Sequence, residues 1–428
     1  MSKDAAHKSK RPVSDITTSD IATSGIAIVG GGMVGASLAL LLARALPQKS
    51  IALLEAKPLV DAAESRTQPD LDLRSTALSP TSTELFARLG VWDSIEYEAA
   101  PIRRIHVSDR GHFGTSRFGP EDNQGKPLGY VVPNRVIGQA LLQRVQDTAN
   151  IEVHAPVEVS ALKPIRGGVE LSVDTGDVVA ELAILADGAG SPLAAQIGIT
   201  SSIKNYRQCA VIANVEHDKP HTDTAFERFP TRGPMALLPL LGELGGAHRS
   251  ALVWTQPADN MKDVQGWSDR EFLAQLQAVF GYRLGQFLRV GQRSVYPLAL
   301  RLAEEQVRSS LVLMGNAAHF LHPVAGQGFN LALRDAARLA EVLVSGAREG
   351  LALGSLNVLQ EYERAQQRDQ SLTVSLSDGF IRIFSSGQPA VIAGRNLGLI
   401  SLELFSGWRD IFLSQMAGRA QPRARLTL

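Results

Sequence analysis

Three glycines, Gly30, Gly32 and Gly35, stand in the spacing G-x-G-x-x-G between a short β-branched run at 26–29 and an apolar stretch at about 34–46. The run predicts a buried parallel strand. The apolar stretch, which ends at a proline, predicts a helix. A strand that enters a helix through such a glycine turn is typical of the βαβ unit of a doubly wound sheet. The sequence therefore predicts an α/β chain built around parallel strands.

An acidic residue completes this pattern. A second buried strand is predicted at 51–54, and Glu55 follows it, 20 residues beyond Gly35. Gly32 lets the backbone approach a pyrophosphate whose charge meets the helix N-terminus, while Gly30 permits the tight turn and Gly35 allows close helix packing. Glu55 is expected to accept hydrogen bonds from ribose hydroxyls and to repel a 2′-phosphate. The pattern thus predicts a site for FAD or NAD and not for NADP.

Composition excludes several other classes of protein. Lys plus Arg and Asp plus Glu both number 43 in 428 residues, so no net charge attracts nucleic acid. The single cysteine, Cys209, excludes a cysteine metal cluster and an internal disulfide, and its neighbours predict a buried small residue, not a reactive thiol. No run approaches the ~20 apolar residues of a membrane span, and no metal-binding constellation is visible. Residues 1–24 are polar and predict a mobile tail.

Strand and helix signals divide the rest of the chain. Residues 103–118 alternate apolar and polar side chains around a turn, which predicts an antiparallel hairpin that is out of place in a doubly wound sheet. Strand signals return between 206 and 295, and residues from 355 onward predict helices. The expected parts are a discontinuous Rossmann-type dinucleotide-binding domain (25–100, 131–200 and 293–350), an antiparallel β-sheet substrate domain (101–130 and 201–292) and a C-terminal helical region (351–428).

Three segments together resemble the FAD-dependent aromatic hydroxylases of the para-hydroxybenzoate hydroxylase type. They are the glycine turn, the run Ala186-Asp187-Gly188-Ala189, and the run Gly315-Asn316-Ala317-Ala318-His319 that leads into 323–330. The likeness extends over 26–384. It implies FAD as the bound dinucleotide and an α/β fold in which a Rossmann-type FAD-binding domain carries an inserted antiparallel-sheet substrate domain and a helical C-terminus.

Within that family the chain is similar to the ubiquinone-biosynthesis branch. The segments that carry this likeness are Arg74-Ser75-Thr76-Ala77-Leu78-Ser79, Pro133-Asn134-Arg135, the run from Leu321 to Leu331 and the run from Asp378 to Phe384. Asn316 stands where the family usually has an aspartate, and together with Phe329 it resembles the 2-octaprenyl-6-methoxyphenol hydroxylase subgroup. An amide can still bind a ribityl hydroxyl of FAD, but it lacks the charge, so the bond is expected to be weaker.

The resemblance also assigns cofactor roles to individual positions. Asp187 and Gly188 would serve the pyrophosphate region of FAD and the passing NAD(P)H, and Arg74 and Arg135 would contact FAD. The backbone N–H groups of 328–330, at the start of a long helix, would face the pyrimidine edge of the flavin, where the helix dipole stabilises the anionic reduced form. The expected cofactor-binding residues are Gly30, Gly32, Gly35, Glu55, Arg74, Arg135, Asp187, Gly188, Asn316, Gly326, Gln327, Gly328, Phe329 and Asn330.

Catalytic and substrate residues are less strongly indicated by the sequence. Pro323 looks like the family proline whose carbonyl faces the reactive flavin edge, because proline keeps φ fixed. His319 and His322 flank it, and each is a candidate base, although a packed histidine is the commoner explanation. An apolar channel between the strand domain and the C-terminal helices would hold a substrate, and core packing would give the same alternation. The candidate lining residues are Phe229, Met235 and Leu237, together with Phe226 and Leu238.

The expected activity is hydroxylation of an activated phenol by oxygen, with NADPH or NADH as a transient electron donor because the chain has one dinucleotide fingerprint. The implied substrate is a polyprenyl methoxyphenol of ubiquinone biosynthesis, hydroxylated para to its hydroxyl. Two alternatives stay open: a flavin hydroxylase of a small soluble phenol or benzoate, and a low-turnover flavin-bound scaffold of a biosynthetic complex. We expect a cytoplasmic protein. Its expected partners are other subunits of a ubiquinone-biosynthesis complex and the inner face of the cell membrane, through the apolar stretch 397–416.

Overall fold

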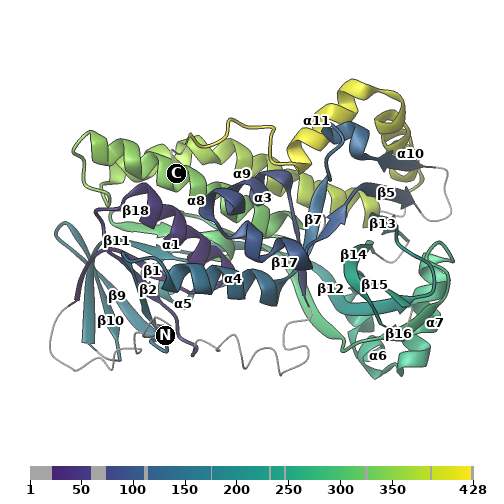
Figure 1. Ribbon diagram of the computed structural model, residues 1–428, viewed down its shortest axis with the longest axis horizontal. Coiled ribbons are helices and arrows are strands. Elements are labelled where there is room, and N and C mark those ends of the chain that lie inside the picture. The colour runs from purple at the N-terminus through teal and green to yellow at the C-terminus, as the bar shows by residue number, and fades with distance from the viewer. Residues whose placement is uncertain are drawn as a thin grey trace, which may run out of the picture.

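The computed structural model describes residues 22–58, 74–109, 114–174, 176–230, 233–244, 247–322, 326–385 and 388–425. Most of the expected mobile tail at 1–24 lies outside these residues, and 22–24 already belong to the first strand. In Figure 1 a mainly parallel sheet with its helices lies beside an antiparallel sheet, and the C-terminal helices run along both.

The mainly parallel sheet has the strand order β18-β19-β11-β1-β2-β8. β1 pairs in parallel with β2 and β11, and β19 pairs in parallel with the other edge of β11. A hairpin of β9 and β10 extends from β11 in antiparallel fashion. The bounds are β1 Ala22–Val29, β2 Ile51–Leu54, β8 Ile151–His154, β9 Val159–Ile165, β10 Gly168–Val173, β11 Gly176–Leu185, β18 Val307–Arg308 and β19 Leu311–Leu313.

Both faces of this sheet are covered, which explains why its strands are apolar without alternation. On one face Ile26 and Ile28 join a core with the helices α1 (Met33–Ala45), α4 (Asn134–Gln146) and α8 (Gln327–Arg348). On the other face Ala27 and Val29 pack in a second core with the β9–β10 hairpin and α5 (Pro192–Gln196). The central strand β1 is therefore buried on both sides, and its carboxyl end is held in a fixed position.

The antiparallel sheet has nine strands in the order β20-β17-β12-β15-β14-β13-β5-β6, with β16 paired to β12. The pairing of β13 with β5 is parallel. One face packs under α6 (Met261–Gly266) and α7 (Asp269–Phe280), where Trp254, Phe272 and Phe280 form the core. The bounds are β5 Arg104–Asp109, β6 Thr115–Phe118, β12 Ser201–His217, β13 Thr224–Phe229, β14 Met235–Leu244, β15 Ala247–Pro257, β16 Phe287–Val290, β17 Ser294–Ala303 and β20 His319–Phe320.

A small third sheet, β3-β7-β4, connects the two larger ones. Its strands are β3 Ser75–Leu78, β4 Ala100–Ile102 and β7 Gly129–Pro133. α3 (Pro80–Leu89) follows β3; the Ser79 hydroxyl caps its N-terminus and Gly90, at φ +68°, ends it in the left-handed conformation. Both signals are read directly from the sequence.

Three helices complete the chain: α9 (Leu356–Ser385), α10 (Pro389–Leu404) and α11 (Ser406–Met416). α9 packs along α8, and α10 packs against β6. Arg395 on α10 forms an ion pair with Asp109 on β5, with Nε 2.6 Å from Oδ2 and side chains only 4% and 1% exposed. Removing one partner of such a buried pair costs several kcal/mol, so this contact fixes α10 on the antiparallel sheet (Figure 1).

The expected fold class is confirmed, with differences at particular elements. The hairpin expected at 103–118 is β5–β6. The β9–β10 hairpin was not expected. The segment expected to return to the parallel sheet at 293 first contributes β17 to the antiparallel sheet. Among the described residues no helix is long and apolar enough to cross a membrane.

Candidate active site

The glycine turn lies at the carboxyl end of β1, tightly packed on its inner side. Gly30 has φ +103°, and a Cβ there would lie 2.5 Å from the carbonyl oxygen of Ala186. A Cβ on Gly35 would lie 1.9 Å from the carbonyl oxygen of Gly30. Gly32, the N-cap of α1, has nothing within 4 Å of the position of a Cβ. The turn is therefore tightly packed on the side that faces the sheet and has free space on its outer side. The N-terminus of α1, which has no side-chain cap, lies at this free space.

Glu55 holds this turn in place. Its Oε2 accepts a hydrogen bond of 2.6 Å from the backbone N–H of Gly31, and Oε1 accepts one of 3.0 Å from Lys57. The carboxylate thus lies at the end of β2 beside the open side of the turn, in the position expected for a ribose contact. The bracing contact with Gly31 was not expected from the sequence.

Asp187 and Gly188 follow the carboxyl end of β11, next to Gly30. Ser191 donates a hydrogen bond of 2.7 Å to Oδ2 of Asp187, while Oδ1 is buried without a hydrogen-bond partner. Burial raises the pKa of this carboxyl. Gly188 has φ +100° with open space at its Cβ position. A buried oxygen without a partner beside an open glycine indicates a place for a polar ligand.

The N-terminus of α8 forms the other polar part of the site. Gly326 caps it with φ +59°, and Gly328 has nothing within 4 Å of a Cβ position. The Asn330 side chain accepts hydrogen bonds from Ser79 N–H (2.8 Å) and Ser82 Oγ (2.7 Å). Its amide donates to the carbonyls of Ala77 and Gly326, both at 2.8 Å. Asn330 thereby fixes the start of α8 against 77–82 with all its hydrogen-bonding capacity used in the protein.

A cavity of about 530 Å³ lies where the three parts of the fold meet. Its first wall comes from three segments: 74–80, which contains β3, 320–322 at the end of β20, and 326–330 at the start of α8. Its second wall is the face of the antiparallel sheet opposite α7. Its third wall is formed by α9, α10 and α11. The main apolar side chains that line it are Ile105, Val107, Phe118, Ala225, Phe229, Ala236, Leu238, Ala251, Phe380, Phe384, Leu399, Phe412 and Leu413.

The predicted substrate residues divide between the two faces of the sheet. Phe229 lines the cavity and stacks on Phe384, with ring centroids 3.5 Å apart. Met235 and Leu237 point to the opposite face and pack under α7, which corrects their assignment to the substrate channel. Phe226 also packs toward α7, whereas Leu238 lines the cavity. Side chains alternate along a strand, so an error of one residue exchanges the faces.

The remaining predicted site residues are placed as follows. Arg74, Asn316, Gln327, Phe329 and His322 line the cavity. Asn316 is exposed in the short 3-10 helix η5 (Gly315–Ala317). Burial lowers the pKa of His322 to about 4, so it is neutral near pH 7. Arg135 pairs with Glu98 instead of pointing into the cavity. Pro323 lies outside the described residues.

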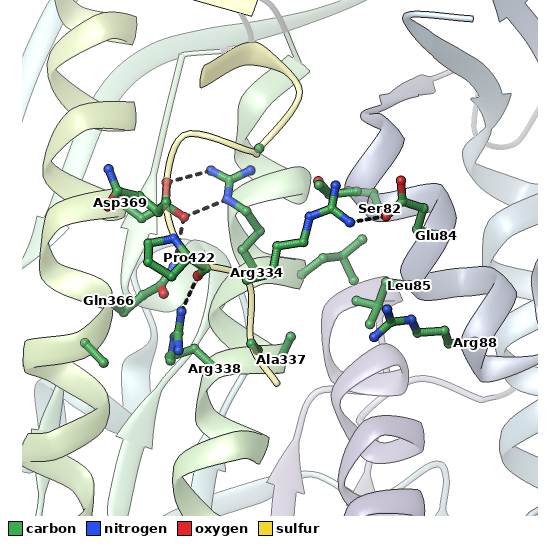
Figure 2. A pocket seen from close by; sticks show the side chains of 17 residues that line it. Ser82, Glu84, Leu85, Arg88, Arg334, Ala337, Arg338, Gln366, Asp369 and Pro422 are labelled. Carbon is green, nitrogen blue, oxygen red and sulfur yellow. Dashed lines mark hydrogen bonds and ion pairs between the residues drawn. The ribbon is translucent and has the colours of Figure 1, made fainter. Parts of the chain in front are cut away.

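A second cavity, of about 280 Å³, lies between α3, α8, α9 and the segment 418–424 (Figure 2). Arg334 on α8 contacts Asp369 on α9 at 2.6 Å, and Arg338 donates to the carbonyl of Pro422. Arg423 pairs with Glu84 on α3. The two cavities share no lining residue. These contacts fasten α8, whose N-terminus forms the site, to its neighbours.

The comparisons with known proteins agree with this geometry. Residues 23–369 match the family described as "FAD binding domain". The chain is 36% identical over 348 residues to "Ubiquinone hydroxylase UbiL" of Rhodospirillum rubrum, which covers 81% of this chain and 80% of the relative. It is 34% identical over 341 residues to the "3-demethoxyubiquinol 3-hydroxylase" of Escherichia coli, covering 79% and 84%. The chain belongs to the FAD-dependent hydroxylases of ubiquinone biosynthesis.

The fold of this hydroxylase is also found in solved structures. That of "p-nitrophenol 4-monooxygenase PnpA" from Pseudomonas putida DLL-E4 superposes with a TM-score of 0.75 at 20% identity, over 94% of this chain and 100% of that chain. At this identity the likeness shows the fold alone. The hydroxylase is an FAD-dependent aromatic monooxygenase with NAD(P)H as electron donor.

The residues of this hydroxylase fit FAD. The outward opening at Gly32 admits a pyrophosphate, and the partnerless oxygen of Asp187 lies at the same edge of the sheet. The first turn of α8 contains no acidic residue, so its positive dipole is available to an electron-rich ring. FAD supplies the redox chemistry when bound, and the protein supplies its position and an apolar space beside it.

Glu227 was missed by the sequence-based prediction. It lies on β13 and lines the cavity between Ala225 and Phe229. Burial raises the pKa of its carboxyl to about 8. The only signal in the sequence was an acid inside a strand that also contains Thr224 and Arg228. Such an acid is usually solvent-facing, so the alternation alone would not have distinguished it.

Proposed function

We propose that this hydroxylase acts on a polyprenyl methoxyphenol and introduces a hydroxyl group para to the existing one, as a step of ubiquinone biosynthesis. The observation that carries the proposal is the cavity of about 530 Å³, whose walls on the sheet and the C-terminal helices are mainly apolar. An apolar lining suits a prenyl tail, while the N-terminus of α8 forms the polar end. The printed functions of the two relatives, both hydroxylases of ubiquinone biosynthesis or its intermediates, support the same class of substrate.

Turnover tests this proposal directly. The FAD-loaded protein is expected to oxidise NADPH or NADH faster in the presence of a short-chain 2-prenyl-6-methoxyphenol, and to yield a product heavier by one oxygen atom. Fragmentation of the product locates the new hydroxyl. Stimulation by 4-hydroxybenzoate alone would replace the prenyl substrate with a small soluble one, and bound FAD without any response to phenols would favour the scaffold role.

The length of the tail can be tested separately. Ala251→Leu adds bulk to the cavity wall on β15, so we expect the KM for a long-tailed substrate to rise about tenfold, equivalent to about 1.4 kcal/mol. The KM for a substrate with a single prenyl unit should change little. Leu237→Met, on the opposite face of the neighbouring strand β14, is the control. Equal effects of Ala251→Leu on long and short tails would contradict a tail along this wall.

Contact with a membrane surface and contact with other subunits of a complex both remain predictions. α10 and α11 expose several large apolar side chains on the outside of the cavity wall, which supports contact with a membrane surface or another subunit. These are Leu397, Leu404, Phe405, Trp408 and Ile411.

A further inference from the structure

Among the described residues that line the cavity, Glu227 is the one acidic or basic side chain on the sheet wall. Its neighbours on the same strand face, Ala225 and Phe229, also line the cavity, while Phe226 and Arg228 lie on the other face. Across the sheet its register partners are Val107 on β5 and Ala236 on β14. A carboxyl group therefore lies in the middle of a wall that is otherwise mainly apolar.

No part of the described protein explains this carboxyl as a structural group. Among the described residues it makes no hydrogen bond or ion pair, and burial raises its pKa to about 8. An unpaired carboxyl in an apolar wall destabilises the fold. Residues that are costly to the fold and face a cavity are candidates for function.

The other charged groups that face the cavity do not provide a counter-charge for Glu227. Asp122 is paired with Arg409, and Arg419 with Glu84. Arg74 lies over the ring of Tyr296 at 5.7 Å. His322 is neutral because burial lowers its pKa to about 4, and Asp410 is exposed on α11. Glu227 is thus left facing the cavity space itself.

We propose that Glu227 binds the phenol hydroxyl of the substrate and accepts its proton. This role rests on the proposed function, because the substrate is then an apolar molecule with a hydroxyl that needs a partner in an apolar cavity. The pKa of a phenol is about 10, so a carboxylate with a pKa of about 8 accepts its proton roughly three orders of magnitude more readily than an ordinary glutamate.

The step is a balanced proton transfer. The O–H bond of the phenol breaks, a bond forms between that proton and a carboxylate oxygen of Glu227, and the electron pair stays on the phenol oxygen. The ring becomes more electron-rich at the para carbon, which favours attack on an electrophilic oxygen. When the C–O bond has formed at the para carbon, the C–H bond of that carbon breaks and its proton leaves to solvent, so the ring becomes aromatic again. The proton held by Glu227 then returns to the phenol oxygen. Oxygen and NAD(P)H supply the new hydroxyl and the electrons, as in the activity already described.

Glu227→Gln tests this role because glutamine keeps the shape and cannot take the proton. For the parent enzyme we expect kcat/KM to rise as the pH rises through about 8, since the carboxylate is the active form. For Glu227→Gln we expect kcat to fall about a hundredfold and the pH dependence near 8 to disappear. Glu216→Gln, in the same sheet but paired with Arg289 outside the cavity, is the control and should behave as the parent.

Binding without NAD(P)H gives a second readout. Titrating the FAD-loaded enzyme with 2-prenyl-6-methoxyphenol and with its methyl ether, followed by the change in flavin absorbance, should show tighter binding of the phenol by the parent. Glu227→Gln should bind the two with more similar affinities. If Glu227→Gln keeps both the pH profile and the discrimination, the role of Glu227 is wrong while the proposed function stands. If the parent binds and hydroxylates no prenyl phenol, both are wrong.

Discussion

Gly32→Val should give a folded protein that purifies without FAD. The Cβ position of Gly32 has open space within 4 Å, so the protein itself tolerates a side chain there. The same space is where the backbone must approach a pyrophosphate. We expect FAD affinity to fall at least about a hundredfold, equivalent to about 2.7 kcal/mol, with the apo-protein melting temperature nearly unchanged. The ratio of flavin to protein absorbance after purification measures it.

Two further glycines make this experiment decisive. Gly35→Ala would bring a Cβ to 1.9 Å from the carbonyl oxygen of Gly30, so it should damage the fold as well as FAD binding. Gly138→Ala on α4 meets nothing within 4 Å and should affect neither. A Gly32→Val protein that retains the parent's FAD content would show that the pyrophosphate does not lie at this turn.

Asn330→Ala should destabilise the protein by about 3–4 kcal/mol and weaken FAD binding. The substitution removes four hydrogen bonds: those from the Ser79 N–H and the Ser82 hydroxyl to the side-chain oxygen, and those from the side-chain amide to the part-buried carbonyls of Ala77 and Gly326. Of these groups, the Ser82 hydroxyl keeps its contact with the Ser79 hydroxyl. Each unsatisfied buried group costs about 1–3 kcal/mol, and relaxation recovers part of the sum. The start of α8 would also lose its fixed position at the site. Urea unfolding of the apo-protein measures the first effect, and FAD titration the second.

Asn357→Ala is the control for this loss, because Asn357 is an exposed asparagine on α9. Exposed substitutions of this kind change stability by less than about 0.5 kcal/mol. Asn330→Asp separates the two halves of the network, since it keeps the acceptor for Ser79 and Ser82 but loses the donor to the two carbonyls. An Asn330→Ala protein as stable as the Asn357→Ala protein would mean that the network contributes nothing.

Local sequence signals predicted the parts of the site that lie near one another in the chain. The glycine turn and Glu55 at the end of β2 follow from spacing and turn chemistry within about 25 residues. The cofactor role of the start of α8 was implied by the family resemblance. The steric demands at Gly30 and Gly35 leave few alternatives. The resemblance to a known family added FAD, which spacing alone did not distinguish from NAD.

Contacts between distant segments were not predictable in this way. Met235 and Leu237 were assigned to the wrong face because both faces of the sheet are covered, one by α7 and the other by the C-terminal helices. The alternation of side chains along a strand separates its residues into two sets, one for each face of the sheet. It does not show which set packs under α7 and which faces the C-terminal helices. The pairing of Arg395 with Asp109 joins segments 286 residues apart, and the role of Glu227 becomes visible only when the cavity is complete.

The parallel pairing of β11 with β19 has an evolutionary consequence. Leu185 and Leu313 are direct register partners, although the chain between them forms β12 to β17, six of the nine strands of the antiparallel sheet. The inserted segment therefore leaves and re-enters the parallel sheet at adjacent points. Such an arrangement lets the inserted segment change in length and in the side chains that line the cavity, while the parallel sheet that carries the glycine turn keeps its geometry. Substitutions in the inserted segment can therefore change its share of the cavity lining while β11 and β19 stay paired.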